Sequence, residues 1–257
     1  NPYIATGLYQ TKFGIADEAV VEVLRQVKDH PFICVEGLAC HIGSQITELK
    51  SFESATERLV FLAREIQKSG YPISRLDLGG GLGISYQDNE MSPSITQYAQ
   101  TLLKHLKDSS FKLFLEPGRS IIGEAGGLLT QVIHTKQNRE RHFTIVDGAM
   151  TELIRPSLYE AFHEIVPVKS KSSQSVVTDI VGPVCETGDF LGLGRTLPEP
   201  ESGELLLIKT AGAYGSTMSS HYNSRPRVAE VMVSGTDAKL IRERETLEDL
   251  WRHERLE

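Results

Sequence analysis

The stretch LFLEPGRSIIGEAG, residues 113–126, joins an apolar run to a turn that carries two opposite charges. The apolar residues 113–115 predict a buried β-strand. This strand must end in EPGR, residues 116–119, because proline cannot donate to a β-ladder and glycine permits a positive φ. A carboxylate and a guanidinium therefore stand at the exit of a predicted strand. By itself the pattern is typical of a turn with a surface ion pair. The neighbouring sequence motifs are needed to tell whether it belongs to a binding site.

Helices and short apolar runs alternate around this stretch. Apolar residues at helical spacing predict helices at 17–29, 50–69 and 94–108, the second with an inner stripe of Phe52, Leu59, Phe61, Leu62 and Ile66. Strands are predicted at 32–43, 73–81 and 111–118. This order predicts βαβ units and a parallel sheet. HIGSQ, GGGLG and EPGR each follow a predicted strand, so they share the sheet edge at which ligands bind in parallel α/β folds.

The pattern changes after residue 126. Short β-branched runs with turn signals between them predict strands, and a helix is predicted only at 155–165 before a short charged helix closes the chain at 246–257. We therefore expect an α/β domain over residues 1–126 and a β-rich domain over residues 127–257.

Composition narrows the class of protein. The chain has 257 residues, of which 40% are hydrophobic and 24% charged, and its net charge is −7. The acidic balance and the lack of a long basic block argue against a nucleic-acid or anionic-membrane partner. No apolar run approaches the roughly 20 residues of a membrane span. Three cysteines without a CxxC pair argue against a disulfide framework or a zinc site, and we expect a reducing cytoplasm.

Two motifs of the first domain have both a structural and a functional interpretation. The glycines of LDLGGGLG, residues 76–83, offer backbone N–H groups to a phosphate, but they serve a tight turn equally well. The motif is neither a Rossmann fingerprint nor a Walker loop. His41 is either a structural residue whose ring nitrogens are hydrogen-bonded within the fold, or a flat ring that stacks on a planar cofactor. In the second case Ser44 would donate a hydrogen bond to a phosphate. No second ligand stands near His41 to suggest a metal.

Two further motifs lie in the second domain. Cys185 in GPVCETGD has polar neighbours in a predicted loop, where a thiol can act as a general acid, although most lone cysteines are small core residues. Tyr214 stands in a Gly-Ala-Tyr-Gly corner at the start of a segment rich in tyrosine and arginine. The alternative to a functional site here is a β-hairpin that merely carries polar side chains.

Six segments thus follow one another along the chain: HIGSQ, LDLGGGLG, EPGRS, DGAMTELIRPSLY, GPVCETGD and AGAYGSTMSSHYNSRPR. Together they closely resemble the diaminopimelate decarboxylases, pyridoxal-phosphate enzymes of fold type III (alanine-racemase-like). The resemblance implies the C-terminal half of a cofactor-binding (β/α)8 barrel followed by a β-rich, sandwich- or barrel-like domain. It implies decarboxylation of meso-2,6-diaminopimelate to L-lysine, the last step of lysine biosynthesis, in a cytoplasmic homodimer with shared active sites. An ornithine, arginine or carboxynorspermidine decarboxylase of the same fold is the alternative.

The resemblance also implies roles for individual residues. Pyridoxal 5′-phosphate would contact His41, Ser44, Gly81, Glu116, Pro117, Gly118, Arg119 and Tyr214. The amino-acid substrate would contact Arg119, Arg155, Tyr159, Glu186 and Tyr214. Glu116 would keep the pyridine nitrogen protonated, and Cys185 of the other subunit would deliver a proton to Cα after CO2 leaves. No metal is implied.

The family's Schiff-base lysine has no counterpart in this sequence. In the family this lysine lies in an early barrel strand, in a Tyr-Ala-x-Lys-like motif, whereas Lys12 matches a later, non-catalytic part of the pattern. The chain opens with Asn1, which matches mid-barrel sequence, and we expect the N-terminal half of the barrel to lie outside it. The alternative to an enzyme is a non-catalytic fragment that binds phosphate or a partner without doing chemistry.

Overall fold

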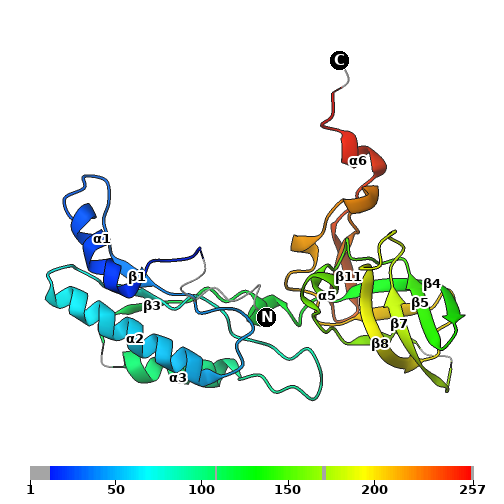
Figure 1. Ribbon diagram of the computed structural model, residues 1–257, viewed down its shortest axis with the longest axis horizontal. Helices are drawn as coiled ribbons and strands as arrows, with labels where there is room; N and C mark the ends of the chain where they lie inside the picture. Colours follow the sequence, from blue (N-terminus) through cyan, green and yellow to red (C-terminus); the bar gives the residue numbers. More distant parts are fainter. Residues whose placement is uncertain (1–11, 108, 170–171, 256–257) are drawn as a thin grey trace. The chain divides into compact units, whose positions relative to one another are not determined.

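The computed structural model describes residues 12–107, 109–169 and 172–255 (Figure 1). The described residues up to Ile121 form one compact unit, and those from Ile122 onward form a second. Each unit has its own sheet and its own hydrophobic core. The sequence-based domains, residues 1–126 and 127–257, stay a prediction.

Three parallel strands form the sheet of the first unit. Their order is β1 (Gly37–Ala39), β2 (Arg75–Asp77) and β3 (Lys112–Phe114). Helix α2 (Leu49–Lys68) joins β1 to β2, and α3 (Ile95–Leu106) joins β2 to β3, so the predicted parallel βαβ order is confirmed. Before β1 come the short 3-10 turn η2 (Asp17–Ala19) and helix α1 (Val20–Val27).

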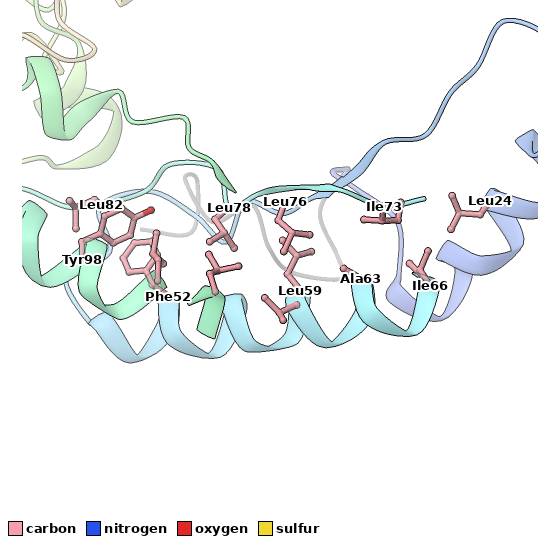
Figure 2. Packing of buried hydrophobic residues seen from close by; sticks show 13 residues of the cluster. Leu24, Phe52, Leu59, Ala63, Ile66, Ile73, Leu76, Leu78, Leu82 and Tyr98 are labelled. Atoms are coloured by element: carbon pink, nitrogen blue, oxygen red, sulfur yellow. The ribbon is translucent and has the colours of Figure 1, made fainter. Parts of the chain in front are cut away.

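The core of this unit lies between the sheet and the helices α2 and α3 (Figure 2). Leu59 and Ala63 on α2 face Leu76 of β2, and all three side chains are buried. Phe52 on α2 meets Tyr98 on α3 edge to face, with ring centroids 4.8 Å apart. Burial of each large apolar side chain stabilises the fold by about 1.5–3 kcal/mol. This packing fixes the sheet edge from which the candidate site is built.

Two expectations about burial in this unit are wrong. Phe61 is 53% exposed, because the buried stripe of α2 lies on the opposite side of the helix, and the guanidinium of Arg58 covers its ring at 5.6 Å. Phe114 and Leu115 are 43% and 40% exposed. Side chains alternate along a strand, so Phe114 points away from the face on which Leu113 packs against the core, and Leu115 lies beyond the end of β3.

The second unit contains a six-stranded sheet with the order β6-β9-β4-β5-β7-β8. Its strands are β4 (Leu128–Asn138), β5 (Arg141–Val146), β6 (Ile165–Pro167), β7 (Ser175–Val181), β8 (Phe190–Pro198) and β9 (Leu205–Ile208). All neighbours pair antiparallel except β5 and β7, which are parallel. Val146, Leu153, Ile180, Leu191 and Ile208 are completely buried in its core. The predicted β-rich character of this region is confirmed.

The remaining elements are short. They are α4 (Arg119–Ile122), α5 (Arg155–Tyr159), η3 (Ser216–Met218), η4 (Tyr222–Ser224), the hairpin β10 (Glu230–Ser234) and β11 (Asp237–Arg242), and α6 (Leu247–Trp251). The helix predicted over 155–165 is too long, because Glu160 adopts a left-handed φ of 53° and the chain then turns into β6. The sequence patterns also missed β8, whose two glycines resemble a turn, and β11.

Candidate functional site

The three polar segments that follow the parallel strands are joined by backbone hydrogen bonds beyond the strand ends. The N–H of Cys40 donates to the carbonyl of Asp77 at 2.8 Å. On the other side of β2, the N–H of Glu116 donates to the carbonyl of Gly79 at 2.8 Å. The HIGSQ, GGGLG and EPGR segments therefore lie side by side at one edge of the sheet, with the glycine turn in the middle.

The glycine turn is packed too closely for any side chain. A Cβ on Gly80 would lie 2.3 Å from the carbonyl oxygen of Glu116, and a Cβ on Gly81 would lie 2.3 Å from that of Gly43. Gly81 also has a φ of 101°, in the region that favours glycine. Its carbonyl accepts the N–H of Ile46 at 2.9 Å. The turn therefore offers bare backbone at the centre of the edge.

His41 lies directly beside this turn. Its Nδ1 accepts the N–H of Gly80 at 3.3 Å, and a Cβ on Gly79 would lie 2.7 Å from the same nitrogen. The residue as a whole is exposed to solvent. The ring is thus held in place by the turn while remaining accessible, as a stacking partner for a flat ligand must be.

Arg119 is the buried cation of the edge, only 6% exposed, at the start of α4. Its Nη1 donates to the hydroxyl of Tyr86 at 2.5 Å, and its Nη2 donates to the Oγ of Ser44 at 3.0 Å. The guanidinium carbon lies 5.8 Å from the centre of the Tyr86 ring. Hydrogen bonds to two hydroxyl groups thus hold the planar guanidinium of Arg119 in place at this edge of the sheet.

The rest of the EPGR turn is open. Glu116, Pro117 and Gly118 are exposed, and a Cβ on Gly118 would meet nothing within 4 Å. The backbone of Glu116 is fixed by its bond to Gly79, while its carboxylate stands at the surface of the edge. A ligand that approaches the glycine turn therefore meets a carboxylate on a fixed backbone.

In the second unit, α5 carries Arg155 and Tyr159 one helical turn apart. Arg155 is 6% exposed, and its Nη1 lies 2.7 Å from the Nε2 of His163, which is completely buried. The Nδ1 of His163 lies 3.0 Å from the carbonyl of Lys209. Since a guanidinium can only donate, Nε2 accepts and Nδ1 carries the proton, which makes His163 neutral. Tyr159 is partly buried.

Cys185 and Glu186 are exposed in the loop after β7, where the sequence placed an exposed thiol. A hydrogen bond to Glu186 raises the pKa of the Tyr222 phenol, and the neighbouring Cys185 raises it further. The phenol of Tyr222 therefore lies close to the carboxylate of Glu186. Tyr222 is 48% exposed.

Tyr214 has an unusual backbone conformation. Its φ is 60°, a left-handed conformation that a bulky residue adopts only under strain, and its side chain is 40% exposed. The next residue, Gly215, has no room for a Cβ, which would lie 2.4 Å from the carbonyl of Ala211. The corner therefore holds Tyr214 in a backbone conformation that a bulky side chain does not favour.

The sequence did not identify several residues that hold these side chains. Tyr86 and His163 carried no signal, since a tyrosine after a glycine loop and a histidine in an apolar segment are common. Gln45, within HIGSQ, has a φ of 58°, and its side-chain amide both donates to the carbonyl of Ile84, at 2.6 Å, and accepts its N–H. Asp189, at the end of GPVCETGD, ties two loops together, because its carboxylate accepts the N–H groups of Met150 and Val184.

Neither a metal site nor a membrane-spanning helix occurs among the residues that the structure describes. Within residues 12–107, 109–169 and 172–255, no three His, Cys, Asp or Glu side chains are arranged to hold a metal ion. Over the same ranges, none of the helices combines the length and the apolar character that crossing a membrane would require.

The chain is similar to known pyridoxal-dependent enzymes. Residues 1–123 match the family described as pyridoxal-dependent decarboxylase, pyridoxal binding domain. The diaminopimelate decarboxylase of Neisseria meningitidis serogroup A is 48% identical over 96% of this chain. The chain is therefore similar to the pyridoxal-dependent decarboxylases. It spans 61% of the length of the Neisseria enzyme.

Solved structures of this decarboxylase family have the same fold. The crystal structure of diaminopimelate decarboxylase from Helicobacter pylori complexed with L-lysine matches with a TM-score of 0.93 and 40% identity, over 98% of this chain and 63% of that one. A lysine/ornithine decarboxylase from Vibrio vulnificus, complexed with cadaverine, matches with a TM-score of 0.77 over 84% of this chain and 58% of that one. Its 23% identity shows the shared fold alone. The predicted fold class, part of the barrel followed by a β-rich domain, is confirmed.

The residues present fit the phosphate of the family's cofactor. The turn at Gly80 and Gly81 leaves bare backbone where a Cβ would collide with the neighbouring strand exits. Beside it, Ser44 and the buried guanidinium of Arg119 supply a hydroxyl and a positive charge. Backbone N–H groups together with one fixed cation are the donor set that binds phosphate in proteins.

Proposed function

We propose that this chain forms the C-terminal part of a pyridoxal-phosphate decarboxylase that converts meso-2,6-diaminopimelate to L-lysine. The observation that carries the proposal is the sheet edge, where the glycine turn, the ring of His41 and the buried Arg119 are held together. Its support is the 48% identity to a diaminopimelate decarboxylase over 96% of the chain.

The first unit would hold the cofactor. Gly81, Ser44 and Arg119, with the backbone of Pro117 and Gly118, would bind the phosphate, and His41 would stack on the pyridine ring. Glu116 would pair with the pyridine nitrogen and keep it protonated, since its backbone is fixed and its carboxylate is accessible. When bound, the cofactor accepts the electron pair that remains on Cα after CO2 leaves.

The second unit would recognise the distal end of the substrate. Diaminopimelate carries an ammonium and a carboxylate at that end. Glu186 would bind the ammonium, and Arg155 with Tyr159 would bind the carboxylate, whereas ornithine offers no group for Arg155. Tyr214 would contact both cofactor phosphate and substrate. The exposed thiol of Cys185 would then protonate Cα.

We further propose a cytoplasmic homodimer in which Cys185 of one subunit serves the cofactor site of the other. The exposure of Cys185 supports this, because a thiol on a surface loop is accessible to a partner. The cytoplasmic location is supported by the sparse cysteines of the chain.

The proposal is tested with a complete enzyme that contains this chain. CO2 release from diaminopimelate should vanish after the cofactor is removed and return when it is added. Glu116→Gln should lower turnover far more than cofactor affinity. Equal losses would make Glu116 a structural residue. A complete protein without a Schiff-base lysine, or without CO2 release, would refute the proposal in favour of a non-catalytic binding protein.

A further inference from the structure

His163 is a completely buried histidine whose ring contacts two separate segments of the second unit. Its Nδ1 lies 3.0 Å from the carbonyl oxygen of Lys209, and its Nε2 lies 2.7 Å from the Nη1 of Arg155. Lys209 directly follows β9, while Arg155 is the first residue of α5. One imidazole ring therefore connects the backbone after β9 to the side chain that is proposed to bind the distal carboxylate of the substrate.

The backbone on both sides of this ring is fixed by strand pairing. β6 pairs with β9, and Ile165 lies opposite Ile208. The pairing continues for one more residue, because the N–H of Lys209 donates to the carbonyl of Glu164 at 2.8 Å. The side chains of Glu164 and Lys209 also form an ion pair. The ring of His163 is therefore held at the end of a β-ladder.

The helix that carries Arg155 gives its side chain much less guidance. α5 has only five residues, and Glu160 ends it with a left-handed φ of 53°. An arginine side chain has several rotatable bonds, and holding it in one direction costs conformational entropy. The hydrogen bond to His163 fixes one end of the guanidinium against this freedom, because the ring itself is buried and held by the ladder.

The two hydrogen bonds also determine the tautomer of His163. A guanidinium can only donate and a backbone carbonyl can only accept, so Nε2 carries the lone pair and Nδ1 carries the proton. His163 is then a neutral acceptor, which holds the Nη1 of Arg155 by a hydrogen bond and not by an ion pair. A carboxylate in this place would instead pair with the charge that is proposed to bind the substrate.

We propose that His163 is a positioning residue that directs the guanidinium of Arg155 toward the distal carboxylate of the substrate. The inference rests on the proposed function, because that function assigns the distal carboxylate to Arg155. Both residues belong to one chain and touch each other, so the arrangement does not depend on which subunit supplies Cys185. Ornithine has no distal carboxylate, and a misplaced guanidinium should therefore affect diaminopimelate far more than ornithine.

Two variants separate the two hydrogen bonds of the ring. In His163→Asn the amide nitrogen can stand where Nδ1 stands and donate to Lys209, but the side chain is too short to reach Arg155. In His163→Gln the amide oxygen can reach the position of Nε2 and accept from Arg155. His134→Asn is the matched control, because His134 lies at an exposed position of β4.

The complete enzyme is assayed with diaminopimelate and with ornithine. In His163→Asn the ratio of kcat/KM for diaminopimelate over ornithine should fall about 10- to 100-fold, since a misplacement of about 1 Å can cost about 10²-fold. His163→Gln should recover most of the kcat/KM for diaminopimelate, and His134→Asn should leave the ratio unchanged. In an Arg155→Met enzyme, His163→Asn should have no further effect on the ratio, because the side chain through which His163 acts is gone.

A ratio in His163→Asn equal to that of the unaltered enzyme would overturn the proposal, and so would equal losses in His163→Asn and His163→Gln. A merely structural role would lower the melting temperature and reduce kcat/KM for both substrates by the same factor. If His163→Asn does not fold, His163→Met takes its place, because it fills the space of the ring with only a weak acceptor.

Nitrogen NMR of the unaltered enzyme, with isotope-labelled histidine, tests the geometry without an activity assay. The ring of His163 should show a protonated Nδ1 and an unprotonated Nε2, and a protonated Nε2 would overturn the proposal. If the unaltered enzyme releases no CO2 from diaminopimelate, the proposed function fails. The protonation of Nε2 then still decides whether His163 holds Arg155.

Discussion

Gly80→Ala tests whether the strand exits are held together as tightly as the structure shows. The added methyl carbon would lie 2.3 Å from the carbonyl oxygen of Glu116, against 3.4 Å or more for an ordinary contact. The nearest atoms are backbone, so no flexible side chain can yield. The turn and the EPGR segment must separate by about 1 Å to remove the overlap.

The cost follows from the bonds that this separation strains. The N–H of Leu78 donates to the carbonyl of Phe114 at 3.1 Å, and the N–H of Glu116 donates to that of Gly79 at 2.8 Å. Weakening two hydrogen bonds and overpacking the turn should together lower the free energy of unfolding by about 2–4 kcal/mol. Because Glu116 moves with its backbone, turnover of the complete enzyme should also fall by at least about tenfold.

Urea denaturation followed by circular dichroism measures the first effect, and a CO2-release assay measures the second. Gly118→Ala is the control for stability, because a Cβ there meets nothing within 4 Å. We expect Gly118→Ala to unfold within about 0.5 kcal/mol of the parent. A Gly80→Ala enzyme as stable and as active as the parent would refute the close approach of the two segments.

Three further changes probe other parts of the account. Cys185→Ala should lower turnover about 10²–10⁴-fold. Mixing that variant with one lacking the Schiff-base lysine should restore up to about half of the activity, because one site of a heterodimer keeps both the lysine and Cys185. If proven heterodimers show no rescue, the thiol does not act in the site of the other subunit. Burial, with Asp77 nearby, raises the pKa of Cys40 to about 11. Alkylation at pH 8.5, mapped by mass spectrometry, should therefore label the exposed Cys185 and spare Cys40. Equal labelling of the two cysteines would contradict this. The Arg227 N–H, assisted by the His221 and Arg227 side chains, lowers the pKa of Glu245 from 4.5 to about 2. A carboxyl group whose pKa is lowered by folding stabilises the fold fully only above the pKa that it has in the unfolded chain. Glu245→Gln should therefore be less stable than the parent at pH 6, and the difference in the free energy of unfolding should shrink between pH 4.5 and about 2. A difference that does not depend on pH in urea denaturation would refute this.

Much of the fold was predictable because it depends on periodicity. Helical spacing and the regular glycine-bearing strand exits indicated parallel βαβ units, and parallel strands place their carboxyl ends on one edge. The position of HIGSQ beside GGGLG and EPGR followed directly. Burial was harder to predict, as Phe61 and Phe114 show, because apolar composition does not reveal which face of an element another element covers.

The partners of the site residues were not predictable, because they lie far apart in the sequence. Arg119 meets the hydroxyl of Ser44, 75 residues earlier, and Asp189 meets the N–H of Met150, 39 residues earlier. A pattern shows that a carboxylate or a guanidinium is present. The packing of the sheet determines which donors and acceptors it finds.

A competition experiment tests the central claim most directly. The complete enzyme, with its cofactor, is given equal concentrations of meso-2,6-diaminopimelate and L-ornithine, and the amine products are followed by NMR. The account predicts that L-lysine forms in large excess, because only diaminopimelate offers a distal carboxylate to Arg155 as well as an ammonium to Glu186. Formation of putrescine as the main product would contradict it.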